Sequence, residues 1–256
     1  MTGTPLGRYA AVLFDLDDTL HDDTTSLREA ARRAAAEIPP PYGTDVEAVV
    51  DSFEREALRF WGGLSSEHLV TPMISVRERM WAATLGAHGI DDDGLAVELA
   101  ASYNRHRAGT LQPYPDALPL LAALRTAGCK TALITNGFAA THRDKLRNLG
   151  FEDAFDAVLL ADEVGMVKPD PRIFLRACEL VGVPAAGAVM VGDRYDRDIR
   201  GAIDAGLRTV WLNERGAAMP AGAPAPDVEA RSFGEVVGAL GVALAPGRNE
   251  AAAEPV

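Results

Sequence analysis

Residues 12–23, VLFDLDDTLHDD, run from an apolar stretch directly into a crowd of acids. The five aspartates are Asp15, Asp17, Asp18, Asp22 and Asp23. Carboxylates this close together repel one another, so a chain tolerates them only where something offsets the charge. The apolar run, residues 10–14, is typical of a buried strand, and the acids begin where that strand ends.

Further strands are expected along the chain, separated by helical patterns. Apolar runs of strand type recur at residues 130–134, 157–160, 188–191 and 209–212. Helical patterns lie before or between them, at residues 117–127, 139–149, 171–181 and 198–205, and a last helix is expected at 233–240. Strands that alternate with helices indicate βαβ units and a parallel sheet. The predicted fold class is α/β, with a three-layer, Rossmann-like core.

A long helical insertion follows the first strand. Apolar residues recur at helical spacing over residues 27–38, 46–61, 73–87 and 95–106, and the region has no convincing strand. Four amphipathic helices predict a small bundle. The resulting division is a core of residues 1–20 and 111–244 and a helical cap of residues 21–110. Residues 245–256 are expected to form a disordered tail.

Composition excludes several classes of function. The chain has 256 residues and a formal net charge of −12, which disfavours nucleic acid and anionic membranes as partners. No apolar run approaches the roughly 18 residues of a membrane span, and the N-terminus lacks the layout of a signal peptide. Two cysteines, Cys129 and Cys178, cannot build a disulfide framework. We therefore expect a cytoplasmic enzyme.

Polar residues follow each of the main predicted strands. Asp15 and Asp17 follow the first strand, and Thr135 and Asn136 follow the second. Lys168 lies in the loop beyond the third strand, and Asp193 and Asp198 follow the fourth. Because ligands bind at the carboxyl ends of parallel strands, these side chains are expected at one edge of the sheet.

Four segments carry a family resemblance: FDLDDTL, ITNG, KPDPRIF and GDRYDRDIRGA. In this order they resemble the motifs of the haloacid dehalogenase (HAD) superfamily, and the insertion resembles that family's C1 cap. FDLDDTL, ITNG and VWLNERG are similar to a subgroup of pyrimidine 5′-nucleotidases, acylneuraminate-9-phosphatases and riboflavin-pathway phosphatases.

The resemblance implies a hydrolase of small soluble phosphomonoesters, such as a nucleotide or a sugar phosphate. Asp15 would be the nucleophile that forms an aspartyl-phosphate, and Asp17 the general acid and base. Thr135, Asn136 and Lys168 would bind the phosphoryl group. Asp15, the backbone carbonyl of Asp17, and Asp193 would bind Mg²⁺.

Elementary chemistry leads to the same metal. A carboxylate that attacks a phosphate dianion needs a hard divalent cation between the two, and carboxylate oxygens are suitable ligands. As general acid, Asp17 needs a raised pKa, which neighbouring carboxylates would promote. Asp18 and Asp198 are interpreted as supporting residues, Asp18 also as a helix cap. Lys130 and Lys145 are given no role.

Alternatives remain within and outside the family. Dehalogenases of this family lack the second acid of the first motif, so Asp17 favours phosphate esters. A phosphomutase and a catalytically idle scaffold that binds phosphorylated ligands remain open. His21, Asp22, Trp61 and Trp81 are candidate contacts to the substrate. For the two tryptophans the bundle core is the favoured interpretation, and for His21 and Asp22 a hinge role is equally open.

Overall fold

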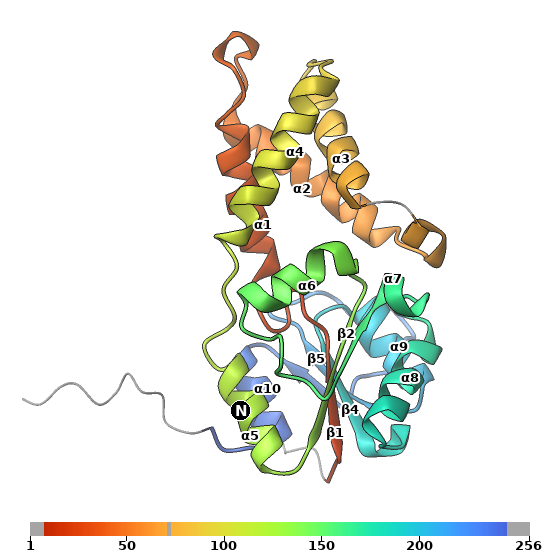
Figure 1. Cartoon of the computed structure of the whole chain (residues 1–256). Coiled ribbons are helices and arrows are strands. Elements are labelled where there is room, and N and C mark those ends of the chain that lie inside the picture. Colours follow the sequence, from red (N-terminus) through yellow and green to blue (C-terminus); the bar gives the residue numbers. More distant parts are fainter. Residues whose placement is uncertain (1–7, 71–72, 245–256) are drawn as a thin grey trace, which may run out of the picture.

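The computed structural model describes residues 8–70 and 73–244 (Figure 1). Within these residues six strands form one sheet in the order β3-β2-β1-β4-β5-β6, and every neighbouring pair is parallel. The strands are β1 (Ala11–Phe14), β2 (Lys130–Thr135), β3 (Ala157–Leu160), β4 (Ala188–Gly192), β5 (Arg208–Leu212) and β6 (Val228–Ala230). The strand order reverses at β1, which lies between β2 and β4, and such a reversal is where open α/β sheets bind ligands. The predicted fold class is confirmed.

Helices cover both faces of the sheet. Successive side chains of a strand point to opposite faces. Val12 and Phe14 belong to a cluster with α5 (Ala117–Thr126), α6 (Ala139–Asn148) and α10 (Phe233–Leu240). Ala11 and Leu13 belong to a second cluster with α8 (Pro171–Val181) and α9 (Arg200–Asp204). The alternation within β1 therefore builds the two outer layers, and Figure 1 shows α5 and α10 on one side of the sheet and α8 and α9 on the other.

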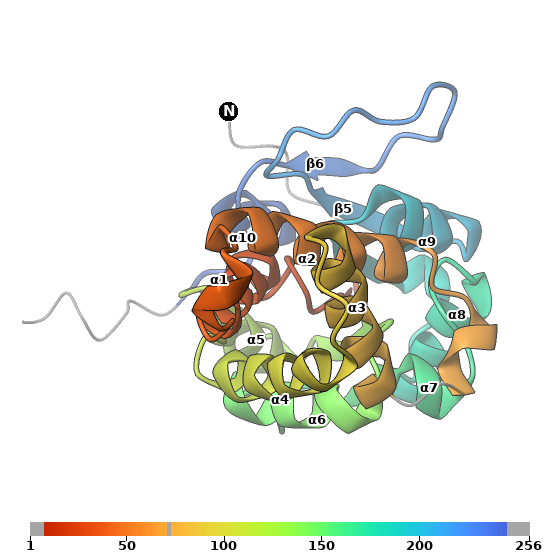
Figure 2. The same cartoon turned by 90° about the horizontal axis from the view of Figure 1, so that it is seen from above.

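The long insertion between β1 and β2 is helical. It contains α1 (Asp23–Ala35), α2 (Val46–Gly62), α3 (Met73–Ala87) and α4 (Asp93–Ala108), with short turns η1 (Pro40–Tyr42) and η2 (Ser66–Val70). The four helices lie above the carboxyl end of the sheet (Figures 1 and 2). The predicted limits of core and cap stay predictions.

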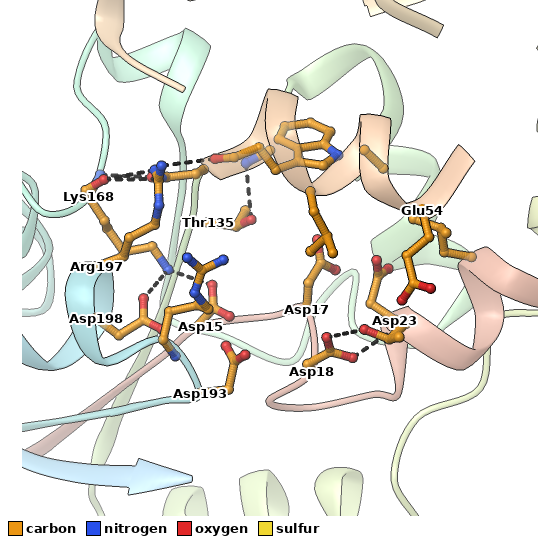
Figure 3. A pocket seen from close by; sticks show the side chains of 18 residues that line it. Asp15, Asp17, Asp18, Asp23, Glu54, Thr135, Lys168, Asp193, Arg197 and Asp198 are labelled. Carbon is orange, nitrogen blue, oxygen red and sulfur yellow. Dashed lines mark hydrogen bonds and ion pairs between the residues drawn. The ribbon is translucent and has the colours of Figure 1, made fainter. Parts of the chain in front are cut away.

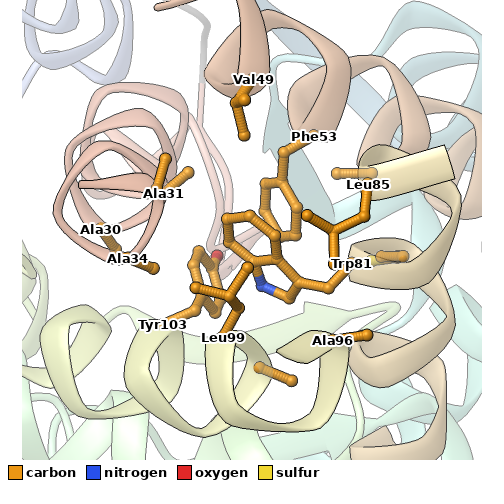
Figure 4. Close-up of a cluster of buried hydrophobic side chains, with 14 of the residues drawn as sticks. Ala30, Ala31, Ala34, Val49, Phe53, Trp81, Leu85, Ala96, Leu99 and Tyr103 are labelled. Carbon is orange, nitrogen blue, oxygen red and sulfur yellow. The ribbon is translucent and has the colours of Figure 1, made fainter. Parts of the chain in front are cut away.

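An aromatic cluster holds the bundle together (Figure 4). Phe53 of α2 stacks on Trp81 of α3 with ring centroids 4.5 Å apart, and Tyr103 of α4 lies 4.9 Å from Phe53. Trp81 has no exposed surface. A buried aromatic pair of this kind contributes about 0.5–1.5 kcal/mol beyond the area it buries.

The structure also contains elements that periodicity did not predict. The predicted helix at residues 198–205 is divided into η4 (Tyr195–Ile199), a π-helical turn, and α9. The short helices α7 (Ala161–Val164) and η3 (Ala185–Gly187) and the three-residue edge strand β6 are additional. Each is too short to show a period. No helix within the described residues is long and apolar enough to cross a membrane. The tail predicted at residues 245–256 lies outside the described residues.

Candidate active site

Asp15 lies directly after β1, at the centre of the sheet edge. Its backbone N–H donates to the carbonyl of Val191 at 3.0 Å, so the parallel ladder to β4 fixes its position. The side chain is buried, and Lys168 Nζ lies 2.5 Å from Asp15 Oδ1. Burial raises the pKa of Asp15 to about 7, with Asp198 and Asp17 adding to the effect against the opposing charge of Lys168.

Lys168 joins two of the predicted acids. Its ammonium also lies 2.7 Å from Asp198 Oδ1, and the side chain is only 3% exposed. Burial opposes the charge, but the two carboxylates outweigh it and raise the pKa of Lys168 above its usual value. The ammonium is therefore charged and held between the end of β1 and η4.

Asn136 holds the backbone of Lys168. Its Oδ1 accepts from the Lys168 N–H at 2.7 Å, and its Nδ2 donates to the Lys168 carbonyl at 3.0 Å. Both polar groups of the Asn136 side chain therefore position Lys168, and the prediction that Asn136 binds phosphate stays a prediction. Thr135 is 2% exposed and lines the cavity described below, and its Oγ1 accepts from the Gly137 N–H at 3.1 Å.

Three carboxylates form an acidic cluster beside Lys168. Asp15, Asp193 and Asp198 bring oxygen atoms within 4.8 Å of one another. Asp193 Oδ1 is buried and has no hydrogen-bond partner. Burial, together with Asp15 and Asp198, raises the pKa of Asp193 well above its usual value. A hard divalent cation would relieve this repulsion and take up the unpartnered oxygen, so the donor set fits a metal ion.

The carboxylate of Asp17 has different neighbours. Its Oδ1 lies 2.7 Å from Lys145 Nζ and 2.9 Å from His21 Nε2, and its Oδ2 lies 3.3 Å from His142 Nε2. Burial by itself would raise the pKa of Asp17, but Lys145, His142 and His21 together hold it well below its usual range. The expectation of a raised pKa is therefore wrong for this arrangement, because three nitrogen-bearing side chains outweigh the nearby carboxylates.

Lys145 and His142 are two of the residues that sequence reasoning missed. Both project from α6, three positions apart and therefore on one face of that helix. Lys145 Nζ also lies 2.8 Å from Asp23 Oδ1 in α1, and Arg107 of α4 pairs with the same carboxylate. The signal was available in the sequence: a His and a Lys at helical spacing, directly after the strand that ends in ITNG.

Arg197 connects η4 to the helical insertion. Its Nη2 donates to the carbonyls of Trp61 at 2.9 Å and Gly62 at 2.7 Å, at the C-terminal end of α2. Its Nη1 donates to the carbonyl of Lys168 at 3.3 Å. A cation at a helix C-terminus is favourable, so Arg197 ties the end of α2 to the loop that carries Lys168.

A cavity of about 160 Å³ lies between the sheet edge and the bundle (Figure 3). The core contributes Asp15, Asp17, Asp18, Thr135, Asn136, Gly137, Lys168, Asp193, Arg194, Arg197 and Asp198. Helices α1 and α2 contribute Asp23, Thr24, Leu27, Glu54, Ala57, Leu58 and Trp61.

The remaining candidates separate into two groups. Trp61 lines the cavity, whereas Trp81 has no exposed surface and lies in the bundle core, as in the favoured interpretation of the sequence. His21 is fully buried and binds Asp17 instead of facing the cavity. Asp22 caps α1 by accepting from the Thr25 N–H at 2.9 Å, and it lines a neighbouring cavity.

Asp18 lines the cavity and also serves the start of α1. Its Oδ1 accepts from the Thr24 N–H at 2.9 Å and its Oδ2 from the Thr24 hydroxyl at 2.6 Å. These bonds satisfy an N–H group in the first turn of the helix, which is what the predicted helix-capping role requires.

Relatives of this chain include several phosphatases. A glyceraldehyde 3-phosphate phosphatase from Methanopyrus kandleri is 36% identical over 203 residues, which cover 79% of this chain and 83% of that protein. A phosphoserine phosphatase from Thermus thermophilus is 34% identical and covers 88% and 96% of the two chains. An N-acylneuraminate-9-phosphatase from Rattus norvegicus is 31% identical and covers 86% and 89%.

Solved structures show the same fold. A HAD-hydrolase from Bacillus subtilis, YfnB, bound to magnesium, superposes with a TM-score of 0.74 at 24% identity over 91% of this chain and 99% of that one. A 2-haloacid dehalogenase from Pseudomonas syringae has a TM-score of 0.62 at 32% identity over 91% and 98%. A sequence model described as haloacid dehalogenase-like hydrolase matches residues 9–206. The match extends over both the insertion and the strand ends that carry Asp15, Lys168 and Asp193, and this chain belongs to the haloacid dehalogenase-like hydrolases.

Proposed function

We propose that this protein is a Mg²⁺-dependent phosphatase that hydrolyses a small phosphomonoester through an aspartyl-phosphate on Asp15. The observation that carries the proposal is the position of Lys168. Its buried ammonium lies 2.5 Å from Asp15 and 2.7 Å from Asp198, next to the unpartnered oxygen of Asp193. Such a site places one ammonium where a phosphoryl group must meet a carboxylate. The phosphatases among the relatives support the same reaction class.

The first half of the reaction transfers the phosphoryl group to Asp15. A carboxylate oxygen of Asp15 attacks phosphorus, and the bond from phosphorus to the ester oxygen breaks. Asp17 donates a proton to that oxygen, which leaves as an alcohol. Asp15, Asp193 and Asp198 are the side chains that would hold Mg²⁺, and the metal when bound would screen the repulsion between Asp15 and the phosphate. The contribution of the Asp17 carbonyl to the metal stays a prediction.

The second half regenerates the enzyme. Asp17 takes a proton from water, the water oxygen attacks phosphorus, and the bond to Asp15 breaks to release phosphate. The low pKa of Asp17 in the ligand-free site keeps its carboxylate ionised, which is the state that can accept a proton. For the acid role Asp17 must be protonated, and a phosphate dianion placed beside it acts in that direction by raising its pKa.

Helices α1 to α4 would act as the predicted cap. The core residues can reach only the phosphoryl end of a substrate, so Trp61 and the other residues of α1 and α2 at the cavity would contact the leaving group. The cytoplasmic location, and the absence of nucleic-acid and membrane partners, stay predictions from composition.

The likeness to a 2-haloacid dehalogenase raises a second candidate, in which Asp15 displaces a halide from carbon. Asp17 weighs against it, because dehalogenases of this family lack the second acid of the first motif. Here Asp17 has three nitrogen-bearing partners within hydrogen-bond distance. Chloride release from 2-chloropropionate, measured beside phosphate release, separates the two reactions.

The test is phosphate release from p-nitrophenyl phosphate with Mg²⁺, in the wild type and in Asp15→Asn. The side chains are nearly isosteric, so the variant should fold but lose activity by several powers of ten, as expected for a missing nucleophile. Asp116→Asn, at an exposed position whose side chain makes no capping hydrogen bond, is the matched control. Retention of more than about a tenth of the wild-type rate in Asp15→Asn would refute the role of Asp15.

A further inference from the structure

The wall of the cavity that faces the leaving group has its own charge pattern. It is built by α1 and α2, opposite the sheet edge (Figure 3). Its side chains are two acids, Asp23 and Glu54, one hydroxyl, Thr24, and an apolar set of Leu27, Ala57, Leu58 and Trp61. Within the described residues, no basic side chain of α1 or α2 lines this cavity.

The two acids of this wall differ in how far their charge is balanced. Asp23 is paired with Lys145 and Arg107, both of them buried, so its charge is offset. Glu54 is paired with Arg28, which does not line the cavity. Arg28 also pairs with Asp51 at 2.8 Å and lies 3.8 Å from Glu47, so one guanidinium is shared among several carboxylates. The negative charge of Glu54 at the cavity wall is therefore only partly balanced.

The basic residues on the core side of the cavity already have partners. Lys168 is bound to Asp15 and Asp198. Arg197 donates to three backbone carbonyls. Arg194 pairs with Asp196, with an Nε–Oδ1 distance of 3.2 Å. Lys168 and Arg194 are thus in ion pairs, and the Nη atoms of Arg197 are bound by carbonyls while its buried Nε has no hydrogen-bond partner. An anionic leaving group would meet Glu54 across the cavity and would have to compete with these existing partners for a cation.

We infer that this site selects phosphomonoesters whose leaving group is an uncharged or ammonium-bearing alcohol and discriminates against leaving groups that carry a carboxylate or a second phosphate. The inference rests on the proposed phosphatase function. A carboxylate in the cavity wall rejects an anionic leaving group effectively. Binding would remove the charge of that group from water without providing a cation as its partner. The apolar side chains of the same wall suit the carbon skeleton of the favoured alcohol.

Two matched pairs of substrates test the inference. Glycerol 3-phosphate and 3-phosphoglycerate differ only by a hydroxymethyl group in place of a carboxylate, and phosphoethanolamine and phosphoserine differ only by a carboxylate. We expect kcat/KM for the first member of each pair to exceed that for the second by about tenfold or more, on the scale of one unfavourable charge contact. Equal values, or a preference for the carboxylates, would overturn the inference.

Variants of Glu54 identify the residue responsible. Glu54→Gln should reduce the ratio of kcat/KM values within each substrate pair. Glu54→Lys should reduce these ratios further or invert them. Glu56→Lys is the matched control, because Glu56 lies on the same helix, pairs with Arg59 and does not line the cavity. Unchanged ratios in both Glu54 variants would contradict the assignment. A carboxylate preference that disappears in Arg194→Gln would show that Arg194 selects the substrate instead.

The same assay distinguishes this inference from the proposed function. Phosphate release from any member of the pairs, or from p-nitrophenyl phosphate, supports a phosphatase whatever the ratios are. No release from any of them with Mg²⁺ present would overturn the proposed function, and the inference with it.

Discussion

Lys145 reaches from α6 to Asp17, with 2.7 Å between its Nζ and Asp17 Oδ1, although the two residues are 128 positions apart in the chain. The same ammonium lies 2.8 Å from Asp23 in α1. One buried cation thus joins the first motif, the start of the helical insertion and the helix after β2. Lys145, which the sequence interpretation left without a role, is a positioning residue for Asp17.

Replacing Lys145 with Met should reduce kcat and move the pH profile. Without the ammonium, Asp17 loses the main charge that lowers its pKa, so we expect the acidic limb of the kcat–pH profile to move to higher pH. A fall in kcat of about 10- to 100-fold is expected for a misplaced acid–base group. Lys130→Met is the control, because Lys130 is exposed and pairs with Asp156. An unchanged profile in Lys145→Met would remove Lys145 from the site.

Lys168→Arg should be nearly as inactive as Lys168→Ala. The ammonium is held by Asp15 and Asp198 in a position that is 3% exposed, and a planar guanidinium cannot take the same place without moving a partner. A displacement of about 1 Å can cost about 100-fold in a positioned reaction. Lys130→Arg should behave as wild type. A Lys168→Arg enzyme with most of the wild-type kcat would show that charge alone is required at this position.

Mg²⁺ should stabilise the protein more at high pH than at low pH. The pKa of Asp15 is raised to about 7 and that of Asp193 lies well above its usual value. A carboxyl group whose pKa is raised by folding adds stability at low pH, and this contribution is lost as pH rises through the folded-state pKa. Below about pH 7 protons therefore occupy the cluster in the metal-free protein and compete with the cation.

We expect the increase in melting temperature on adding Mg²⁺ to metal-stripped protein to be larger at about pH 8 than at about pH 5.5. Differential scanning fluorimetry measures both shifts. Asp193→Asn should reduce the shift at the higher pH, because it removes a ligand. Equal shifts at the two pH values would argue against a metal at this cluster.

The two tryptophans should respond differently to replacement by Phe. Trp81 has no exposed surface and stacks on Phe53, so Trp81→Phe should lose about 1–3 kcal/mol in the free energy of unfolding, with the ranking of substrates unchanged. Trp61→Phe should change the ranking at a nearly constant melting temperature, because Trp61 lines the cavity. Denaturant unfolding and a panel of phosphate esters measure the two effects. Identical behaviour of the two variants would contradict the assignment of Trp81 to the bundle core and of Trp61 to the cavity wall.

Arg197→Met should loosen the contact between α2 and the sheet edge. The variant loses the hydrogen bonds to the carbonyls of Trp61 and Gly62, at 2.9 and 2.7 Å. We expect kcat/KM to fall by about tenfold and hydrogen exchange to accelerate at the C-terminal end of α2. Arg200→Met is the control, since Arg200 is exposed and pairs with Asp204. Wild-type exchange and kinetics in Arg197→Met would show that the contact has no part in catalysis.

The order of strand and helix patterns along the chain was enough to predict the sheet and the centre of the site. Alternation of apolar strands with helical patterns indicated a parallel sheet, and the carboxyl ends of parallel strands must share one edge. That rule places Asp15, Lys168 and Asp193 together without knowledge of any side-chain contact, and the cavity contains all three. Helices α1 and α2 of the insertion have a clear apolar period of the helical kind, whereas α3 and α4 have almost none, so their pattern alone indicated them less strongly.

Which other residues reach the site depends on how the helices pack in three dimensions. Arg197 and Trp61 are 136 positions apart, and no local pattern joins residues at such a separation. Trp61 and Trp81 both lie at helical spacing, and the packing of α1 to α4 decides that one faces the cavity and the other the bundle core. The pKa of Asp17 depends on Lys145 and His142 in α6, so its direction followed from the docking of that helix and not from the neighbouring aspartates in the chain.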